Sequence, residues 1–188
     1  MYGLINRAVQ DLVTTKFGAQ KWEEIKEKSE INVPVFVGMN TYPDEITYKL
    51  VAAASSVLGL TQTQVLEAFG EYWILYTAKE GYGQLLSMSG NSFVEFLQNM
   101  NNLHARVQLS FPKLKAPSFE CSDITAESMR LRYYTERPGL APLVVGLLRG
   151  LGKKFATAVE IVHDKPRGGD RDFDEFLIRF TGPTSSVP

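Results

Sequence analysis

Cysteine and histidine are scarce in this chain, and each scarcity excludes a class of site. The 188 residues include a single cysteine, Cys121, so an internal disulfide cannot form. One thiol also does not make a structural zinc site. A lone cysteine fits a reducing compartment, and we expect a cytoplasmic protein. Any chemistry that needs an imidazole must use one of the two histidines, His104 or His163.

Long apolar runs and an excess of charge of one sign are missing as well. The 20 lysines and arginines nearly balance the 21 aspartates and glutamates, which gives a net charge of -1. Nothing in this mixture favours nucleic acid phosphates as a partner. The N-terminus turns polar at Asn6 and Arg7, so no signal peptide is predicted, and no apolar run is long enough to span a membrane. We therefore expect neither a nucleic acid nor a membrane as a partner.

What the chain does contain is the balance of an ordinary globular domain, with 44% apolar and 22% charged residues. Apolar residues at helical spacing fill the first two-thirds of the sequence. They predict helices at residues 2–17, 20–29, 44–58, 61–80, 83–88 and 92–107. Asp44 is expected to cap the third helix and Gly59 to end it, and Thr61 with Gln64 predicts a capping box for the fourth.

The pattern changes near Pro112 and Pro117, which interrupt the helical periodicity. Four strands are predicted, at residues 118–122, 127–135, 155–163 and 172–180. A helix over 140–152 is inserted between the second and third strands. The predicted fold class is therefore α+β, with a helical N-terminal half followed by a small antiparallel sheet with an inserted helix. We expect one domain over residues 1–181 and a disordered tail over 182–188.

His104 lies on the apolar face of the helix predicted at 92–107. It follows Leu97 by seven residues and Met100 by four, and it precedes Val107 by three, so it points into that face. Such a histidine is most often a core residue that one backbone carbonyl satisfies. It can also be a haem ligand, because one neutral imidazole in a dry pocket is enough to hold haem iron.

A second polar arrangement follows in the strand predicted at 127–135. If the extended conformation persists, Tyr133, Thr135 and Arg137 share one face because strand side chains alternate. All three can donate hydrogen bonds, and the arginine fork matches a carboxylate. The two propionates of haem need such donors. The same spacing also suits a strand face that is exposed to solvent, and the pattern by itself favours that interpretation.

Together these residues resemble a known family. Tyr-x-Ser-x-Arg downstream of a helical histidine is the signature of H-NOX domains (haem nitric oxide/oxygen binding), which include the haem domain of the soluble guanylate cyclase beta subunit. The resemblance runs from Met1 to about Phe180. The matching segments are Met1-Tyr2-Gly3-Leu4-Ile5-Asn6, Ala68-Phe69-Gly70, Glu80-Gly81-Tyr82-Gly83, Asn102-Leu103-His104-Ala105-Arg106 and Ala116-Pro117-Ser118-Phe119-Glu120-Cys121. Thr135 departs from the usual serine but keeps the hydroxyl group.

The resemblance implies a ferrous haem b buried between the helical half and the sheet. His104 would be the proximal ligand of the iron. The residues implied at the propionates are Tyr133, Thr135 and Arg137. Ile5 and Pro117 match family residues that press on the haem and keep it bent.

The resemblance also places Val9, Trp73, Leu143 and Leu147 in the distal pocket. In oxygen-binding members a distal tyrosine stands three residues before a glycine that matches Gly146, and here that position is Leu143. Bound dioxygen depends on a hydrogen-bond donor far more than NO or CO does. An apolar pocket therefore predicts binding of NO and CO and exclusion of oxygen. The indole N–H of Trp73 could donate, but a tryptophan that simply fills the pocket is favoured.

The predicted function is a gas sensor and not an enzyme. NO at the ferrous iron would release His104, free the helix at 92–107 and so signal to a separate partner. By resemblance to stand-alone bacterial members, that partner would be a histidine kinase or a cyclic-dinucleotide enzyme. The alternative is a haem enzyme or gas scavenger of the peroxidase or NO-detoxifying type, although the distal side offers no acid–base group. A haem-free helical interaction module, with His104 merely packed, is the third interpretation.

Overall fold

The computed structural model describes residues 1–182, apart from the side chain of Lys79. The N-terminal half is helical, as predicted. Its helices are α1 (Gly3–Phe17), α2 (Ala19–Ser29), α3 (Asp44–Leu58), α4 (Gln62–Thr77), the π-helical turn η1 (Ala78–Tyr82), α5 (Gly83–Ser87), α6 (Phe93–Gln98) and α7 (Met100–Ser110). No helix within the described residues is long and apolar enough to cross a membrane. The tail predicted to be disordered lies, from residue 183 on, outside the described residues.

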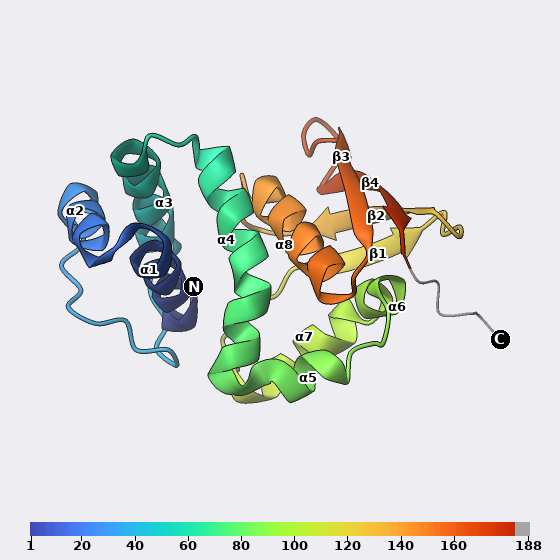
Figure 1. Ribbon diagram of the computed structural model, residues 1–188, viewed down its shortest axis with the longest axis horizontal. Helices are drawn as coiled ribbons and strands as arrows, with labels where there is room; N and C mark the ends of the chain where they lie inside the picture. The colour runs from blue at the N-terminus through green and yellow to red at the C-terminus, as the bar shows by residue number, and fades with distance from the viewer. Residues whose placement is uncertain (183–188) are drawn as a thin grey trace.

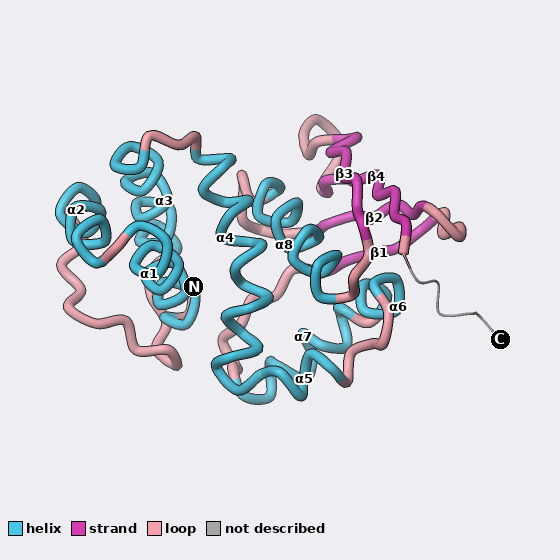
Figure 2. Tube along the Cα trace, viewed as in Figure 1, coloured by secondary structure: helices cyan, strands magenta, loops and turns pink. Residues whose placement is uncertain are grey.

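The C-terminal part is a four-stranded antiparallel sheet in the order β1-β2-β4-β3. Its elements are β1 (Ser118–Ser122), β2 (Ser128–Tyr134), α8 (Ala141–Lys154), β3 (Ala158–Lys165) and β4 (Phe173–Thr181). Figure 1 shows α4 and α8 between the N-terminal helices and the sheet, and Figure 2 shows that all strands gather at one end. The predicted α+β class, with one helix inserted in the sheet, is confirmed.

Helices α4 and α8 cross with their backbones in contact. A Cβ atom on Gly70 would lie 2.2 Å from the carbonyl oxygen of Leu143, and one on Gly146 would lie 2.0 Å from that of Glu67. Glycine is therefore required on both helices, because any side chain would push them apart. Arg149 of α8 also pairs with Glu67 at 2.5 Å on the edge of the crossing. The crossing fixes one wall of the interior between helices and sheet.

The predicted ends of α3 and α4 are confirmed in two respects and wrong in one. Thr61 and Gln64 form the expected capping box, and Gly59 ends α3 in the left-handed conformation, with φ of 67°. Asp44 does not cap α3, because it is the first helical residue and its carboxylate makes no cap hydrogen bond. That carboxylate instead bonds groups far away in the sequence.

The helix predicted at 92–107 is two helices. The break falls at Asn99, whose φ of -94° and ψ of 3° lie outside the α-helical region. Asparagine favours such positions because its short polar side chain competes with the helical backbone hydrogen bonds. Ser92 caps the first helix by accepting a hydrogen bond from the backbone N–H of Glu95. Helix α7, which carries His104, therefore has an axis of its own.

The sheet buries one face and leaves the other to solvent. Along β2, Met129, Leu131 and Tyr133 are buried, whereas Arg130 and Arg132 between them lie on the outer face. This alternation is what a half-buried strand requires. The inner face joins the core formed with α6, α7 and α8.

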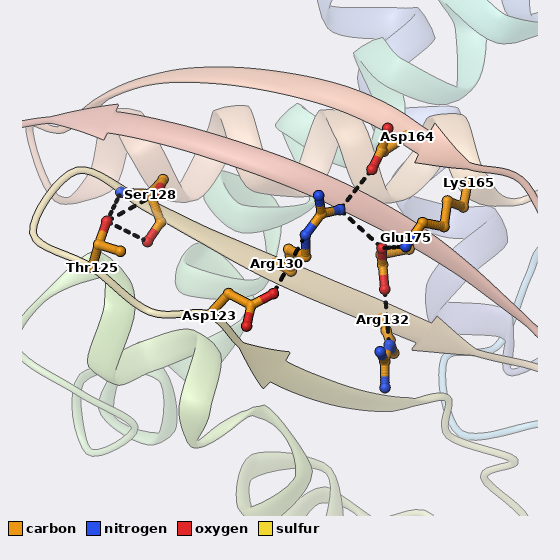
Figure 3. Close-up of polar contacts among 8 residues, drawn as sticks. All are labelled: Asp123, Thr125, Ser128, Arg130, Arg132, Asp164, Lys165 and Glu175. Atoms are coloured by element: carbon orange, nitrogen blue, oxygen red, sulfur yellow. Dashed lines mark hydrogen bonds and ion pairs between the residues drawn. The ribbon is translucent and has the colours of Figure 1, made fainter.

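The outer face of the sheet carries a charged network centred on Glu175 (Figure 3). Glu175 accepts hydrogen bonds from Arg130 at 2.9 Å, Arg132 at 2.9 Å and Lys165 at 2.6 Å. The long side chains of these cations cover it, which leaves 1% of it exposed. Burial alone would raise the pKa of Glu175, but the hydrogen bonds from Lys165 and Arg132 lower it to about 2. The network thus ties β2, β3 and β4 together.

Candidate functional site

Helix α7 is fastened to β1 and to the segment before it by three side chains on one face. The amide of Asn101 donates to the carbonyl of Phe119 at 2.8 Å and accepts from its N–H at 2.9 Å. The Nδ1 atom of His104 lies 3.2 Å from the carbonyl oxygen of Pro117. Gln108 donates to a carbonyl of the same segment at 3.1 Å. These residues are three and four apart, so they share a helix face, and His104 is the middle connection.

The hydrogen bond to Pro117 sets the state of the His104 ring. A carbonyl can only accept, so Nδ1 carries the proton and Nε2 keeps its lone pair. Within residues 1–182, Nε2 has no hydrogen-bond partner. Burial lowers the pKa of His104, and the hydrogen bond to Pro117 opposes this only in part. The ring is therefore a neutral imidazole held at one nitrogen and free at the other, as in histidine ligands of metals.

The predicted iron ligand and the first predicted propionate residue lie on the same side of the sheet. Phe119 of β1 is opposite Tyr133 of β2 in the strand register. The Phe119 ring centroid lies 5.9 Å from that of His104 and 5.3 Å from that of Tyr133. Burial raises the pKa of Tyr133, so its phenol keeps the proton and remains a hydrogen-bond donor.

Thr135 and Arg137 come together in a different way from the one expected. Strand β2 ends at Tyr134, so the alternation that placed them on one strand face does not continue. The Thr135 hydroxyl instead accepts a hydrogen bond from the backbone N–H of Arg137 at 3.1 Å. A hollow of about 280 Å³ opens beside Thr135.

Arg137 is oriented by Asp44, at the start of α3. Its Nε donates to Asp44 at 2.6 Å, and its Nη1 donates to the carbonyl of Lys115 at 2.8 Å. The other oxygen of Asp44 pairs with the Met1 ammonium at 2.5 Å. Burial would raise the pKa of Asp44, but the ammonium and Arg137 together lower it. Sequence reasoning missed this role, because Asp44 and Arg137 are 93 residues apart.

The predicted distal residues come from three helices that share one hydrophobic cluster. Val9 lies on α1, Trp73 on α4, and Leu143 and Leu147 on α8. Ile5, which is predicted to press on the haem, also lies on α1. Val9 is 3% exposed, and the others are partly buried against the core. Among the described residues, the indole N–H of Trp73 has no hydrogen-bond partner.

The second histidine and the single cysteine have structural surroundings. His163 is exposed on β3, where its Nε2 lies 2.8 Å from Asp174 and its ring stacks on that of Phe176 with centroids 4.8 Å apart. Burial, with the nearby charge of Glu120, raises the pKa of the Cys121 thiol to about 11, so it is not a reactive thiolate. In the described part of the chain, no three histidine, cysteine or acidic side chains gather where they could hold a metal ion.

The residues present fit a haem. A neutral, partly buried imidazole with a free Nε2 would suit a ligand of haem iron, and a phenol, a hydroxyl and a guanidinium would suit the propionates. This donor set within an α+β fold is that of a haem-binding domain.

The comparisons identify the family. The model of the Haem-NO-binding family matches residues 2–163, so the chain belongs to this family of H-NOX domains, which bind haem and serve as sensor domains. The soluble guanylate cyclase gcy-32 of Caenorhabditis elegans is 32% identical over 157 residues, which is 82% of this chain and 23% of that protein. The soluble guanylate cyclase 89Db of Drosophila melanogaster is 24% identical over 155 residues, again 82% and 23%. The chain spans about a quarter of the length of these relatives.

Solved structures share the fold along the whole chain. A mutant H-NOX protein from S. oneidensis in the Fe(II) state superposes with a TM-score of 0.89 at 22% identity and covers 98% of both chains. The Fe(II)NO state of the S. oneidensis protein gives 0.86 at 21% identity, over 97% of this chain and 100% of that one. The unliganded Fe(II) H-NOX protein from K. algicida gives 0.84 at 23% identity, over 100% of both.

Proposed function

We propose that this chain is a haem-based gas sensor that binds NO and CO at ferrous iron, excludes oxygen, and signals by release of His104. The observation that carries the proposal is the state of His104: Nδ1 is bonded to Pro117, Nε2 is free, and the ring is partly buried and neutral. Membership of the Haem-NO-binding family supports it.

Haem b would supply a ferrous iron with one open coordination position for a diatomic gas. His104 would hold the iron through Nε2, and Ile5 and Pro117 would pack against the macrocycle. The propionates would accept hydrogen bonds from Tyr133, Thr135 and Arg137. Arg137 suits this role because Asp44 and Lys115 engage its Nε and Nη1, which leaves Nη2 to donate.

The predicted distal side lacks a well-placed donor for bound oxygen. Val9, Leu143 and Leu147 are apolar. Trp73 packs edge-on against Phe69, with ring centroids 5.9 Å apart. That packing supports a filling role for the indole, because its ring is held by neighbours on its own helix. NO and CO would therefore bind, and dioxygen would gain too little to form a stable complex.

Release of His104 would break the bond between Nε2 and the iron, so α7 would lose its link to the haem, while the hydrogen bond of Nδ1 to Pro117 would remain. Asn101 and Gln108 would still hold the helix on either side. The break at Asn99 separates α7 from α6, so α7 can move as one rigid piece. Leu109, near the end of α7, is 84% exposed and would carry that movement to the surface. The proposed receiver is a histidine kinase or a cyclic-dinucleotide enzyme.

The test is an absorption spectrum of the reduced protein, alone and then with oxygen, CO and NO. We expect a five-coordinate ferrous spectrum that air leaves unchanged and that CO and NO shift. His104→Ala should lose this spectrum, whereas the matched control His163→Ala should keep it. A stable oxygen complex would show that Trp73 or another donor acts on the ligand and would overturn the exclusion of oxygen. Rapid peroxide turnover would favour the haem enzyme instead.

A further inference from the structure

Three oxidisable rings follow one another on α4 and end at a carboxylate of α1. Trp73 stacks on Tyr76, with ring centroids 6.1 Å apart and planes 26° apart. Tyr76 lies 6.2 Å from Tyr72. The Tyr72 hydroxyl donates a hydrogen bond to Asp11, 61 residues away in the sequence. The set thus joins a predicted distal-pocket residue to the contact between α1 and α4 (Figure 1).

The two tyrosines are buried, and one has a built-in proton acceptor. Tyr76 is 4% and Tyr72 is 8% exposed. Burial, reinforced by the hydrogen bond to Asp11, raises the pKa of Tyr72 to about 12, so the phenol keeps its proton at neutral pH. A phenol that loses an electron becomes a strong acid, and oxidation is easiest where a base already holds its proton. Asp11 is such a base.

We propose that Trp73, Tyr76, Tyr72 and Asp11 form a relay that supplies an electron to an oxidised haem and leaves the oxidation on Tyr72. The proposal rests on the proposed haem-binding function, because the relay begins at the distal side. Neighbouring aromatic rings pass electrons much faster than aliphatic side chains do. The relay would protect the distal pocket by moving oxidising equivalents to the α1–α4 contact.

The oxidant is a hydroperoxide, which reacts slowly because the distal side has no acid–base group. Its O–O bond breaks as it takes up two electrons and two solvent protons. The products are one water and either an alcohol or, from hydrogen peroxide, a second water. One electron comes from the haem and the other from Tyr72, through Tyr76 and Trp73. The phenolic proton of Tyr72 passes to the Asp11 carboxylate, which gives a neutral tyrosyl radical and a carboxylic acid. Two thiols of the cell then return one electron each, one to the haem and one to Tyr72; they form a disulfide and release two protons, and the phenolic proton moves back from Asp11.

The relay is tested by electron paramagnetic resonance on the haem-loaded ferric protein, frozen after mixing with hydrogen peroxide. We expect a tyrosyl signal that Tyr72→Phe largely abolishes. Asp11→Asn should lose the signal and Asp11→Glu should restore it, which a merely structural role of Asp11 would not predict. If Tyr72→Phe fails to fold, the tyrosyl signals of the Asp11 variants and of Trp73→Phe test the relay instead.

The matched control is a second tyrosine–carboxylate pair. Tyr134 donates to Glu120 at 3.0 Å on the outer sheet face, but its aromatic neighbour is Phe173, which is hard to oxidise. Tyr134→Phe and Glu120→Gln should leave the signal unchanged. The relay is overturned if the tyrosyl signal persists in Tyr72→Phe and Asp11→Asn, or if the wild type gives no signal. In either case the haem absorption spectrum can still support the sensor function. A protein that binds no haem overturns both.

Discussion

Gly146→Ala should destabilise the protein by separating α4 from α8. The added Cβ would lie 2.0 Å from the carbonyl oxygen of Glu67, whereas an ordinary contact begins at 3.4 Å. The helices would have to part by more than an ångström, because the obstacle is backbone and cannot rotate away. Overpacking of a core costs about 1–3 kcal/mol, and a backbone clash on this scale belongs at the upper end. The better helix propensity of alanine returns about 1 kcal/mol, so we expect a net loss of about 2 kcal/mol.

The assay is thermal unfolding followed by circular dichroism. For a domain of this size, a loss of 2 kcal/mol lowers the midpoint by about 4–8 °C. Gly150→Ala is the graded control, because its Cβ would lie 2.9 Å from the Glu71 oxygen and 3.0 Å from a movable Ile74 side chain. It should cost clearly less. Equal stability of Gly146→Ala and the wild type, or a larger loss in Gly150→Ala, would refute the close crossing. Since Leu143 and Leu147 flank Gly146, the CO spectrum of the loaded variant should also shift.

Three further predictions concern α7, the His104 ring and the network on the outer face of the sheet. Asn101→Ala removes both hydrogen bonds to Phe119, so it should lower the free energy of unfolding by about 1–2 kcal/mol and speed amide hydrogen exchange along α7. The control Asn102→Ala should do neither. Equal exchange rates in the two variants would contradict the proposed anchoring. Burial lowers the pKa of His104, so without haem the unfolded chain binds a proton on His104 at a higher pH than the folded protein does. The stability of the haem-free protein should therefore fall as the pH drops below 6.5. His104→Phe should flatten that part of the pH profile measured by urea unfolding. The pKa of Glu175 is lowered to about 2, so its carboxylate stabilises the fold fully above pH 4.5, and this stabilisation is lost as the pH falls from 4.5 to about 2. Glu175→Gln should remove this pH dependence of the free energy of unfolding. If the variant kept the pH profile of the wild type, that result would count against the network.

Features that depend on neighbours in the sequence could be predicted. The Thr61–Gln64 capping box and the Gly59 end of α3 follow from side chains and backbone within four residues of one another. The apolar face of the helix around His104 follows from helical spacing, because one turn repeats every 3.6 residues. The scarcity of histidine then leaves few candidates for an iron ligand, and the segments shared with H-NOX domains point to His104.

What the sequence by itself determined was therefore the α+β class, the family resemblance and the identity of the candidate residues. The tertiary structure alone decided which of them meet. Asp44 was expected to cap a helix and instead orients Arg137, and Tyr72 finds Asp11 across two helices. Glu175 becomes buried only because cations from two other strands cover it. Such contacts depend on how elements distant in the chain pack, and local propensity and periodicity carry no information about that packing.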